Sequence, residues 1–382
     1  MRKTFKYRLY PTRKQAETLQ LWLDLCRRVY NDALAWRREA WEDSRQSVNY
    51  YDQARQLPQL KRDAPELMVV HSQVLQDVLR RLDKAFQAFY RRCKNGEKPG
   101  YPRFKSETRY HSFTFPQWGN GAFFREGKLW LSKIGAIRIK LHRPIKGCIK
   151  TVTITHKAGR WYACFSVEVE TKRSRPLPKT KTKTGKTVGI DVGVESFATL
   201  SDGTQIENPK WYRRAERRLA KAQRRVSRRK KGSNRRKKAM QLLQRAHEKV
   251  QNQRKDFHHK LSHKLVNEND AIYFEDLNVK GMVRNHVHPL AKSISDAGWG
   301  QFLRFVCYKA EEAGREAIAV PPQWTSQVCS GCGETVTKSL SQRWHRCPHC
   351  GLELHRDHNA ALNIQRLGRS LQGVPVVTGA MN

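Results

Sequence analysis

Four cysteines near the C-terminus of this chain have the type and spacing of a metal site. Cys329 with Cys332 and Cys347 with Cys350 form two C-x-x-C pairs, and each pair is followed by a glycine. Such knuckles let four thiolates converge on one ion, and a complete set of four is typical of structural zinc. The spacing favours one structural Zn²⁺ over a redox role for either pair. His345 and His349 lie nearby but would be surplus to four ligands, so we expect both at the surface.

Three carboxylates form a second candidate set, because each stands at the end of a predicted element. Asp191 follows the apolar strand residues 188–190, Glu275 closes a strand at 271–275, and Asp357 lies where the last helix begins. Acids brought together without partners repel one another, whereas a pair of Mg²⁺ ions would hold all three ionised. Two such ions can activate water and stabilise the leaving oxygen in phosphodiester hydrolysis.

Each of these acids also has a simpler interpretation. Asp191 could cap a turn, Glu275 could pair with one of the many arginines, and Asp357 could be a helix N-cap. The neighbouring Asp276 should point to the opposite side of the strand from Glu275, so it is the weaker candidate. The placement of all three acids, Asp191, Glu275 and Asp357, at the ends of predicted elements favours the functional interpretation.

The elements that carry these acids follow one order. Strands are predicted near 187–193, 196–200 and 203–206, then a long basic helical region. A strand at 271–275, a helix near 301–313, a strand at 317–320 and a final helix from about residue 357 follow. This is the element order of a ribonuclease H-like domain.

The first half of the chain predicts a β module interrupted by helices. Alternating Phe5, Tyr7 and Leu9 indicate a short strand, and Thr12 with Gln15 has capping-box spacing at the start of a helix. Ser72 is expected to cap a second helix. From about residue 127 the pattern changes to period two, with a hairpin turn at residues 157–160. The first strand is expected to pair back into this later sheet, which leaves the helices as an insertion.

The net charge predicts a polyanionic partner. The chain has 75 Lys and Arg against 34 Asp and Glu, a formal charge of +41. Basic side chains gain free energy on nucleic acids by releasing condensed counterions. The charge is densest at residues 209–265, which we interpret as two helices folded into a hairpin that follows phosphates; a localisation signal or a disordered arm is the alternative. Its candidate contacts are Arg224, Arg225, Arg228, Arg229, Lys230 and Lys231.

Other features limit the setting of the protein. We find no apolar stretch of transmembrane length and no hydrophobic block at the start, so neither a membrane span nor a secretory signal is expected. Five scattered cysteines beside one tight cluster favour free thiols and a reducing cytosol over a disulfide framework. Residues 171–186 have the composition of a linker.

The order of these motifs resembles the TnpB family of transposon-encoded, RNA-guided DNA nucleases, relatives of the type V CRISPR effectors. The resemblance covers nearly the whole chain. It includes KTFKYRLYPT, VGIDVGVESFATLSDG, FEDLNVKGM and RCPHCGLELHRDHNAALNI. It places a RuvC-type triad on Asp191, Glu275 and Asp357 and a zinc ribbon on the four clustered cysteines. His355, where many relatives have an acid, and Trp324, where Tyr is usual, depart from the family pattern without removing a triad member.

The resemblance implies a multidomain α+β protein. The expected parts are a first strand of a β-barrel-like wedge module at 1–11, a helical recognition domain at 12–125 and the rest of the wedge at 126–180. A ribonuclease H-like (RuvC) nuclease domain follows at 181–368, with the basic hairpin (209–265) and an inserted zinc ribbon (324–353). Residues 369–382 are expected to be a disordered tail.

The implied activity is cleavage of double-stranded DNA beside a short transposon-adjacent motif. The expected cofactors are two Mg²⁺ and one Zn²⁺, and the expected partners are a guide RNA from the transposon end and target DNA, held by one protein chain in the cytosol. Base pairing would supply sequence specificity. Gln73, Gln76 and Arg80 are candidates to contact bases or phosphates near the adjacent motif.

Two other functions remain compatible with the sequence. One is a ribonuclease H-like transposase that acts without guide RNA, and the other is a non-enzymatic zinc-ribbon regulator that binds RNA. Purified protein would separate the three. Copurified RNA of one defined species supports the guided nuclease, strand transfer supports the transposase, and binding without Mg-dependent cutting supports the regulator.

Overall fold

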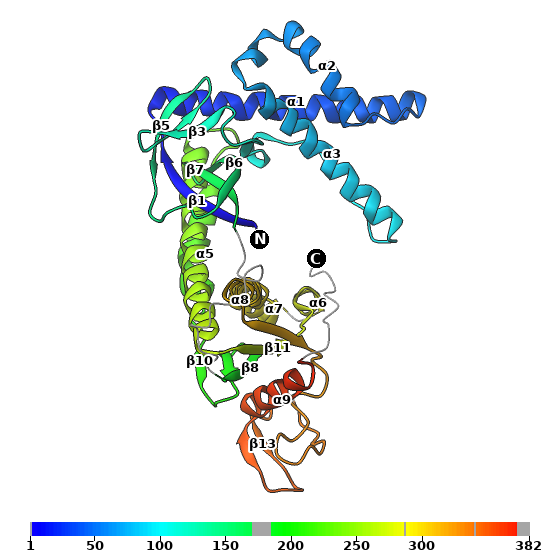
Figure 1. The fold of residues 1–382 in the computed structure, drawn as a ribbon, viewed down its shortest axis with the longest axis vertical. Helices are drawn as coiled ribbons and strands as arrows, with labels where there is room; N and C mark the ends of the chain where they lie inside the picture. The colour runs from blue at the N-terminus through cyan, green and yellow to red at the C-terminus, as the bar shows by residue number, and fades with distance from the viewer. Residues whose placement is uncertain (1, 170–184, 286–287, 340, 373–382) are drawn as a thin grey trace. The chain divides into compact units, whose positions relative to one another are not determined.

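The computed structural model describes residues 2–169, 185–285, 288–339 and 341–372 of a mixed α+β protein (Figure 1). The chain divides into two compact units, Met1–Glu170 and Thr171–Asn382, which are treated separately below. Most of the predicted linker at 171–186 and of the predicted tail at 369–382 lies outside the described residues. A search of the described helices finds none with the length and apolar character of a membrane span.

The first unit contains one antiparallel sheet in the order β2-β6-β7-β1-β5-β4-β3. Its strands are β1 (Arg2–Tyr10), β2 (Ser112–Phe115), β3 (Ala122–Arg125), β4 (Lys128–Leu131), β5 (Gly135–Lys140), β6 (Cys148–Lys157) and β7 (Arg160–Glu168). β1 lies between β7 and β5, which confirms that the first strand pairs back into the later sheet. The sheet also takes β2 and β3, which precede the boundary expected at residue 126.

Local sequence explains two connections of this unit. Ala158 and Gly159 join β6 to β7 and both have positive φ, as the tight turns that match strand twist require. The capping box of Thr12 and Gln15 is present at the start of the first helix. Ser72, by contrast, is not a cap. His71 occupies the N-cap position without a side-chain bond, and the Ser72 hydroxyl, already in the first helical turn, accepts a hydrogen bond from Lys61.

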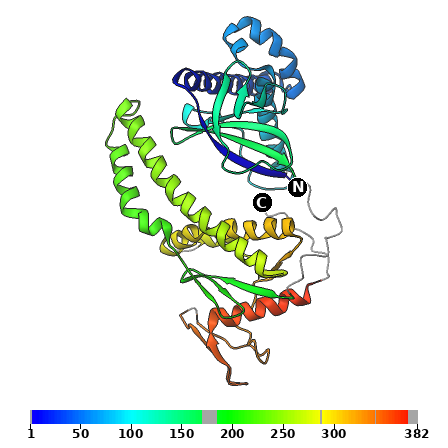
Figure 2. The same cartoon turned by 60° about the vertical axis from the view of Figure 1, so that its left-hand side comes forward.

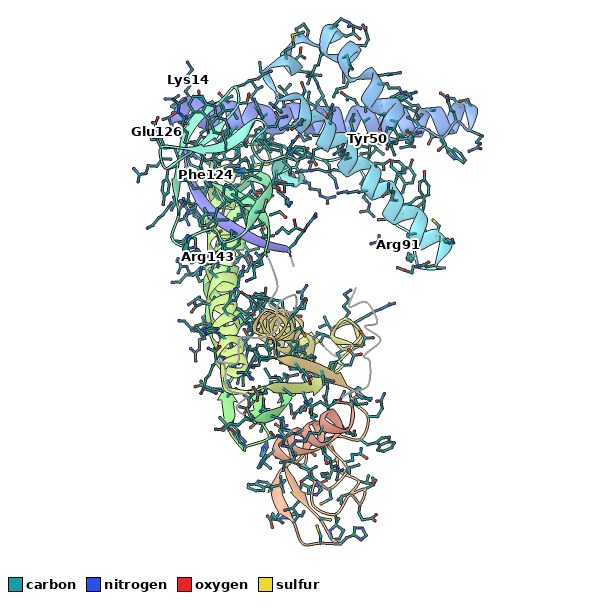
Figure 3. All side chains as sticks on the ribbon, viewed as in Figure 1. Lys14, Tyr50, Arg91, Phe124, Glu126 and Arg143 are labelled. Carbon is teal, nitrogen blue, oxygen red and sulfur yellow. The ribbon has the colours of Figure 1, made fainter. Side chains whose placement is uncertain are left out.

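The helices of the first unit are α1 (Arg13–Ser44), α2 (Tyr50–Asp63) and α3 (Ser72–Lys94), with short 3₁₀ turns at Pro65–Val69 and Glu107–Arg109. Of these helices, α2 was not predicted from the sequence. The buried stripe of α3 packs on α1 and β2, while its last turns, which carry Arg91, extend beyond these elements (Figure 3).

The second unit is built on a sheet in the order β10-β9-β8-β11-β12. The strands are β8 (Thr187–Val192), β9 (Ser196–Leu200), β10 (Gln205–Glu207), β11 (Ala271–Glu275) and β12 (Glu316–Val320). The first three are antiparallel, whereas β11 runs parallel to both β8 and β12. Every strand predicted in this half of the chain is confirmed.

Among the described residues, the helices that accompany this sheet are α4 (Trp211–Ser227), α5 (Asn234–Glu268), α6 (Val279–Asn285), α7 (His288–Ala297), α8 (Trp299–Ala313) and α9 (Arg356–Ser370). A small hairpin of β13 (Trp344–Arg346) and β14 (Glu353–His355) precedes α9. α4 and α5 pack side by side, which confirms the predicted helical hairpin (Figure 2, green to yellow-green). α6 and α7 were not predicted.

The two faces of the sheet bury different helices. Ile190, Ile272 and Phe274 pack with α5 and α8, whereas Tyr273 faces Ile364 of α9. α9 approaches its face very closely. A Cβ atom on Gly189 would lie 2.1 Å from the Ala361 carbonyl oxygen, and one on Gly368 would lie 2.1 Å from the Tyr273 ring. These two glycines therefore let the helix and the sheet come into contact.

We expect Gly368→Ala to destabilise the second unit by about 1 to 3 kcal/mol, because the new methyl group must displace a buried ring. The matched control is Gly300→Ala in α8, where an added Cβ meets nothing within 4 Å. That change should stabilise by roughly 0.5 to 1 kcal/mol through helix propensity alone. Urea unfolding followed by tryptophan fluorescence measures both, and equal effects would show that Gly368 is not a contact point.

Candidate active site

The alternation of side chains along two parallel strands brings two acids to the same face. In β8, Val188 and Ile190 point to the α5 and α8 side, so Gly189 and Asp191 point toward α9. In β11 the same alternation places Glu275 on the α9 side with Tyr273. Ile190 pairs with Phe274, so the two acids occupy neighbouring positions at the carboxyl ends of adjacent strands.

The third acid is supplied by the start of α9. Its N-cap is His355, whose Nδ1 accepts a hydrogen bond of 3.3 Å from the Asp357 backbone N–H. A Cβ atom on Gly193, just after β8, would lie 4.0 Å from an Asp357 carboxylate oxygen. Asp357 therefore lies beside the end of β8. The structure brings the three predicted carboxylates together, and Asp276 lies exposed outside the set.

The electrostatics of Asp191 reflect this grouping. Burial raises the pKa of its carboxyl well above the ordinary value, and the charges of Glu275 and Asp357 raise it further, against a smaller opposing effect of Arg356. Within the described residues, no hydrogen bond or ion pair to the Asp191 side chain is found. An acid in these surroundings is poorly stabilised as an anion unless a cation binds.

Glu275 has one polar neighbour that was not predicted from the sequence. The hydroxyl of Thr325 donates a hydrogen bond of 2.5 Å to its Oε1. Burial raises the pKa of Glu275, and this hydrogen bond partly offsets the rise. Thr325 lies fifty residues away in the sequence, in the segment between β12 and the cysteine cluster, and nothing in its local pattern indicated the contact.

The four cysteines form a compact cluster whose ligand atoms all lie within 4.8 Å of one another. Cys329 Sγ is 3.7 Å from Cys350 Sγ, and Cys332 Sγ is 3.6 Å from Cys347 Sγ. A tetrahedral site with metal–sulfur bonds of about 2.3 Å would place the sulfurs about 3.8 Å apart, so the donor set fits zinc. Gly333 and Gly351, both at positive φ, close the two turns by donating to the carbonyls of Cys329 and Cys347.

His345 was expected at the surface, and this was wrong. It lies fully buried in β13, where its ring contacts the Lys338 side chain. Side chains alternate along β13, so His345 points to the face opposite the exposed Trp344 and Arg346. A histidine that is not needed as a metal ligand can therefore still be buried.

The basic hairpin forms a hollow of about 780 Å³ between α4 and α5. Six basic residues line it, Arg218, Lys221, Arg224, Arg225, Arg228 and Arg229, together with Ala222, Ala239 and Leu242. Arg236 donates to the carbonyls of Val226 and Arg229, which closes the turn between the helices. Asp296 of α7 accepts from the backbone N–H groups of Tyr212 and Arg213 and so caps α4. Lys230 and Lys231 lie in the turn. The hairpin thus presents a fixed cationic surface.

The three candidate contacts on α3 differ in their surroundings. Gln73 donates to Gln117 at 3.2 Å, and Arg80 donates to the Tyr50 hydroxyl at 3.2 Å while lying over the same ring. Gln76 is exposed. These residues belong to the first unit, whereas the carboxylates, the cysteines and the basic hairpin belong to the second.

Three family models match the chain. One, described as "Probable transposase", covers residues 164–286, another, "Cas12f1-like, TNB domain", covers 299–364, and "Helix-turn-helix domain" covers 1–46. In the last range the described residues form β1 and one long helix, α1, rather than two helices joined by a turn.

Similar proteins match over almost the whole length. One from Streptomyces pristinaespiralis, provisionally named an RNA-guided DNA endonuclease, is 38% identical over 378 residues, covering 96% of this chain and 90% of the relative. Another from Escherichia coli K12, with the same provisional activity, is 32% identical over 383 residues, covering 96% and 92%. The chain belongs to the TnpB family. A solved Cas12f1–sgRNA–target DNA complex shares the fold, with a TM-score of 0.59 and 13% identity over 96% of this chain and 98% of that one.

The raised pKa of Asp191 in this TnpB-family chain predicts a stability that depends on pH. When the pKa of a carboxyl is higher in the folded than in the unfolded state, the folded protein loses stability as the pH rises through the range between the two values. Without divalent cations, Asp191→Asn should therefore be more stable than wild type at pH 8 by at least about 1 kcal/mol, and the gain should shrink toward pH 4. Thermal unfolding at both pH values measures this, with the exposed Asp276→Asn as control. An unchanged melting temperature at pH 8 would contradict it.

Proposed function

We propose that the chain is an RNA-guided DNA endonuclease that cuts double-stranded DNA at a single RuvC-like site. The observation that carries the proposal is the convergence of Asp191, Glu275 and Asp357 on one face of the second sheet. The strand order, with three antiparallel strands followed by two parallel ones, is that of a ribonuclease H-like fold, and the acids come from the first strand, the fourth strand and the last helix. The provisional names of the two bacterial relatives support the same activity.

The three side chains offer oxygen donors, and among the described residues no cationic side chain forms an ion pair with Asp191. Both features suit a hard divalent cation, and we assign two Mg²⁺ ions to the three carboxylates. When bound, these ions would activate water and stabilise the leaving oxygen of a phosphodiester. The protein itself fixes the ligands. The rigid strands hold Asp191 and Glu275, Thr325 orients the Glu275 carboxylate, and the capped start of α9 holds Asp357.

The partners follow from charge and from the relatives. A guide RNA from the transposon end would pair with one DNA strand, and the basic hairpin would hold RNA or heteroduplex by its backbone. Gln76, exposed on α3, is our candidate to read the adjacent motif, with Gln73 and Arg80 beside it. One chain holds the complete acid and cysteine sets, so we expect one protein chain per RNA.

The function is tested on protein purified with its RNA. Asp191→Ala, Glu275→Ala and Asp357→Ala should each reduce Mg-dependent DNA cleavage by at least about a hundredfold and leave RNA binding near wild type, because each removes a metal ligand but no phosphate contact. Cleavage and RNA affinity are measured in parallel, with Asp276→Ala as the control that keeps cutting. Strand transfer without RNA would instead identify a transposase, and RNA binding without cutting a regulator.

The cysteine cluster is assigned one structural Zn²⁺. Replacing Cys329 or Cys347, the two buried members, with serine should remove the zinc and lower the thermal stability of the protein, because ligand binding and folding of so small a ribbon are coupled. Metal analysis by mass spectrometry gives the zinc content per chain, with Cys26→Ser, a buried cysteine of the first unit, as control. Folded, active wild-type protein without zinc would contradict the assignment.

The basic hairpin should bind phosphates without regard to sequence, since its arginine and lysine runs contain no aromatic residues for base stacking. Neutralising Arg228, Arg229, Lys230 and Lys231 together to Gln should weaken binding about equally for unrelated guides. It should also reduce the slope of log affinity against log salt by roughly one unit for each phosphate that is no longer bound. Filter binding at several salt concentrations measures both. Wild-type affinity and slope in the fourfold variant would place the RNA-binding surface elsewhere.

A further inference from the structure

Thr325 lies at the meeting point of the carboxylate site and the cysteine cluster. Its side chain is almost fully buried, and its hydroxyl donates to Glu275 Oε1 at 2.5 Å, with the Pro322 carbonyl a more distant acceptor at 3.3 Å. Its own carbonyl oxygen accepts a hydrogen bond of 2.9 Å from Asn363 Nδ2. The residue therefore contacts a catalytic carboxylate on one side and α9 on the other.

Two asparagines extend this contact to the first cysteine knuckle. Asn359 and Asn363 lie one turn apart on α9, and both are buried. Each donates to the Val328 carbonyl at 2.7 Å, directly before Cys329. Asn359 Oδ1 also accepts from the backbone N–H of Ser330, inside the C-x-x-C turn, at 2.9 Å. The amide side chains of α9 thus bind backbone atoms on both sides of a metal-ligating cysteine.

Asp357 lies in the first turn of the same helix, two residues before Asn359. One short segment, residues 325–330, therefore helps to hold two of the three carboxylates in place. Glu275 is held through the Thr325 hydroxyl, and Asp357 is held through the helix that Asn359 and Asn363 fasten to the knuckle. Asn363 Oδ1 is buried without a hydrogen-bond partner among the described residues, so holding this amide in place costs stability.

We propose that Thr325 is a positioning residue for Glu275, and that Asn359 and Asn363 couple it to the zinc knuckle, so that an ordered ribbon sets the affinity of the carboxylate site for divalent cations. This inference rests on the proposed function. It assigns a role in catalysis to residues that touch neither the phosphodiester nor the ions, and it gives the zinc a role beyond folding of the ribbon.

The test compares Thr325→Val, which removes the hydroxyl at nearly constant shape, with Thr325→Ser, which keeps it. The full chain is used with its RNA, and Mn²⁺ binding is followed by electron paramagnetic resonance, with the Asp191→Ala protein as the blank for ions bound to RNA. Loss of a hydrogen bond to a charged group should weaken Mn²⁺ binding about tenfold in Thr325→Val. The Mg²⁺ concentration for half-maximal cleavage should rise by a similar factor. Thr325→Ser should restore both, and zinc content should stay at one per chain.

Thr187→Val is the matched control. Thr187 also contacts α9, but its hydroxyl and carbonyl accept hydrogen bonds from Gln365 and Arg369, at the opposite end of the helix from Asp357, and bind no carboxylate. The change should lower stability and leave Mn²⁺ affinity unchanged. A weaker site in this variant would mean that any loosening of α9 has the same effect, and would overturn a specific role for Thr325.

A double-mutant cycle tests the coupling to the knuckle. Asn363→Ser should weaken Mn²⁺ binding in the wild-type background and have little further effect in Thr325→Val, because both changes break one path. Additive losses would overturn the coupling. If wild type cuts DNA but Thr325→Val keeps its Mn²⁺ affinity and Mg²⁺ midpoint, the positioning role is wrong. If wild type with its RNA does not cut DNA at all, the proposed function fails instead.

Discussion

Close contact between α9 and the second sheet is the constraint on which the candidate site depends. A helix normally packs on a sheet through intervening side chains, but here Gly189 on β8 and Gly368 on α9 leave no Cβ between backbone and neighbour. Because α9 lies so near the strands, the acid at its first turn can lie beside acids at the strand ends. The carboxyl ends of β8 and β11 and the start of α9 form one site only at this short separation.

That site concentrates negative charge in a strongly basic protein. Asp191 has no cationic side chain bonded to it among the described residues, although lysines and arginines outnumber acids about two to one in the chain. The cations are gathered instead on surfaces such as the α4–α5 hairpin, where Asp296 and Arg236 fix the helix ends and leave the arginine rows exposed. Cationic and anionic side chains thus lie in different places and can serve different functions. Exposed cations can attract phosphates, while carboxylates without cationic partners can bind metal ions.

The cysteine ribbon is part of the same arrangement, because it is inserted between β12 and α9 (Figure 1, orange and red). β14 ends at His355, and α9 begins at the next residue, so the ribbon determines where the helix starts. Hydrogen bonds from Asn359 and Asn363 fasten the helix to the first knuckle. The position of Asp357 therefore depends on the ribbon through the chain itself and through its side-chain contacts.

Much of this could be predicted from local sequence. The two C-x-x-C knuckles, the alternation in β1 and β7, the strand residues before Asp191 and Glu275 and the capping box at Thr12 are all patterns within a few residues, and local geometry determines them. The basic hairpin was predictable for the same reason, since its turn lies between two continuous helical runs. Tertiary structure alone decided that β2 and β3 join the first sheet, that His345 is buried, and that Arg80 is bound to Tyr50. It also decided that Thr325 meets Glu275. These contacts join residues that are distant in sequence, and their energies depend on which backbone segments lie side by side, which no local pattern specifies.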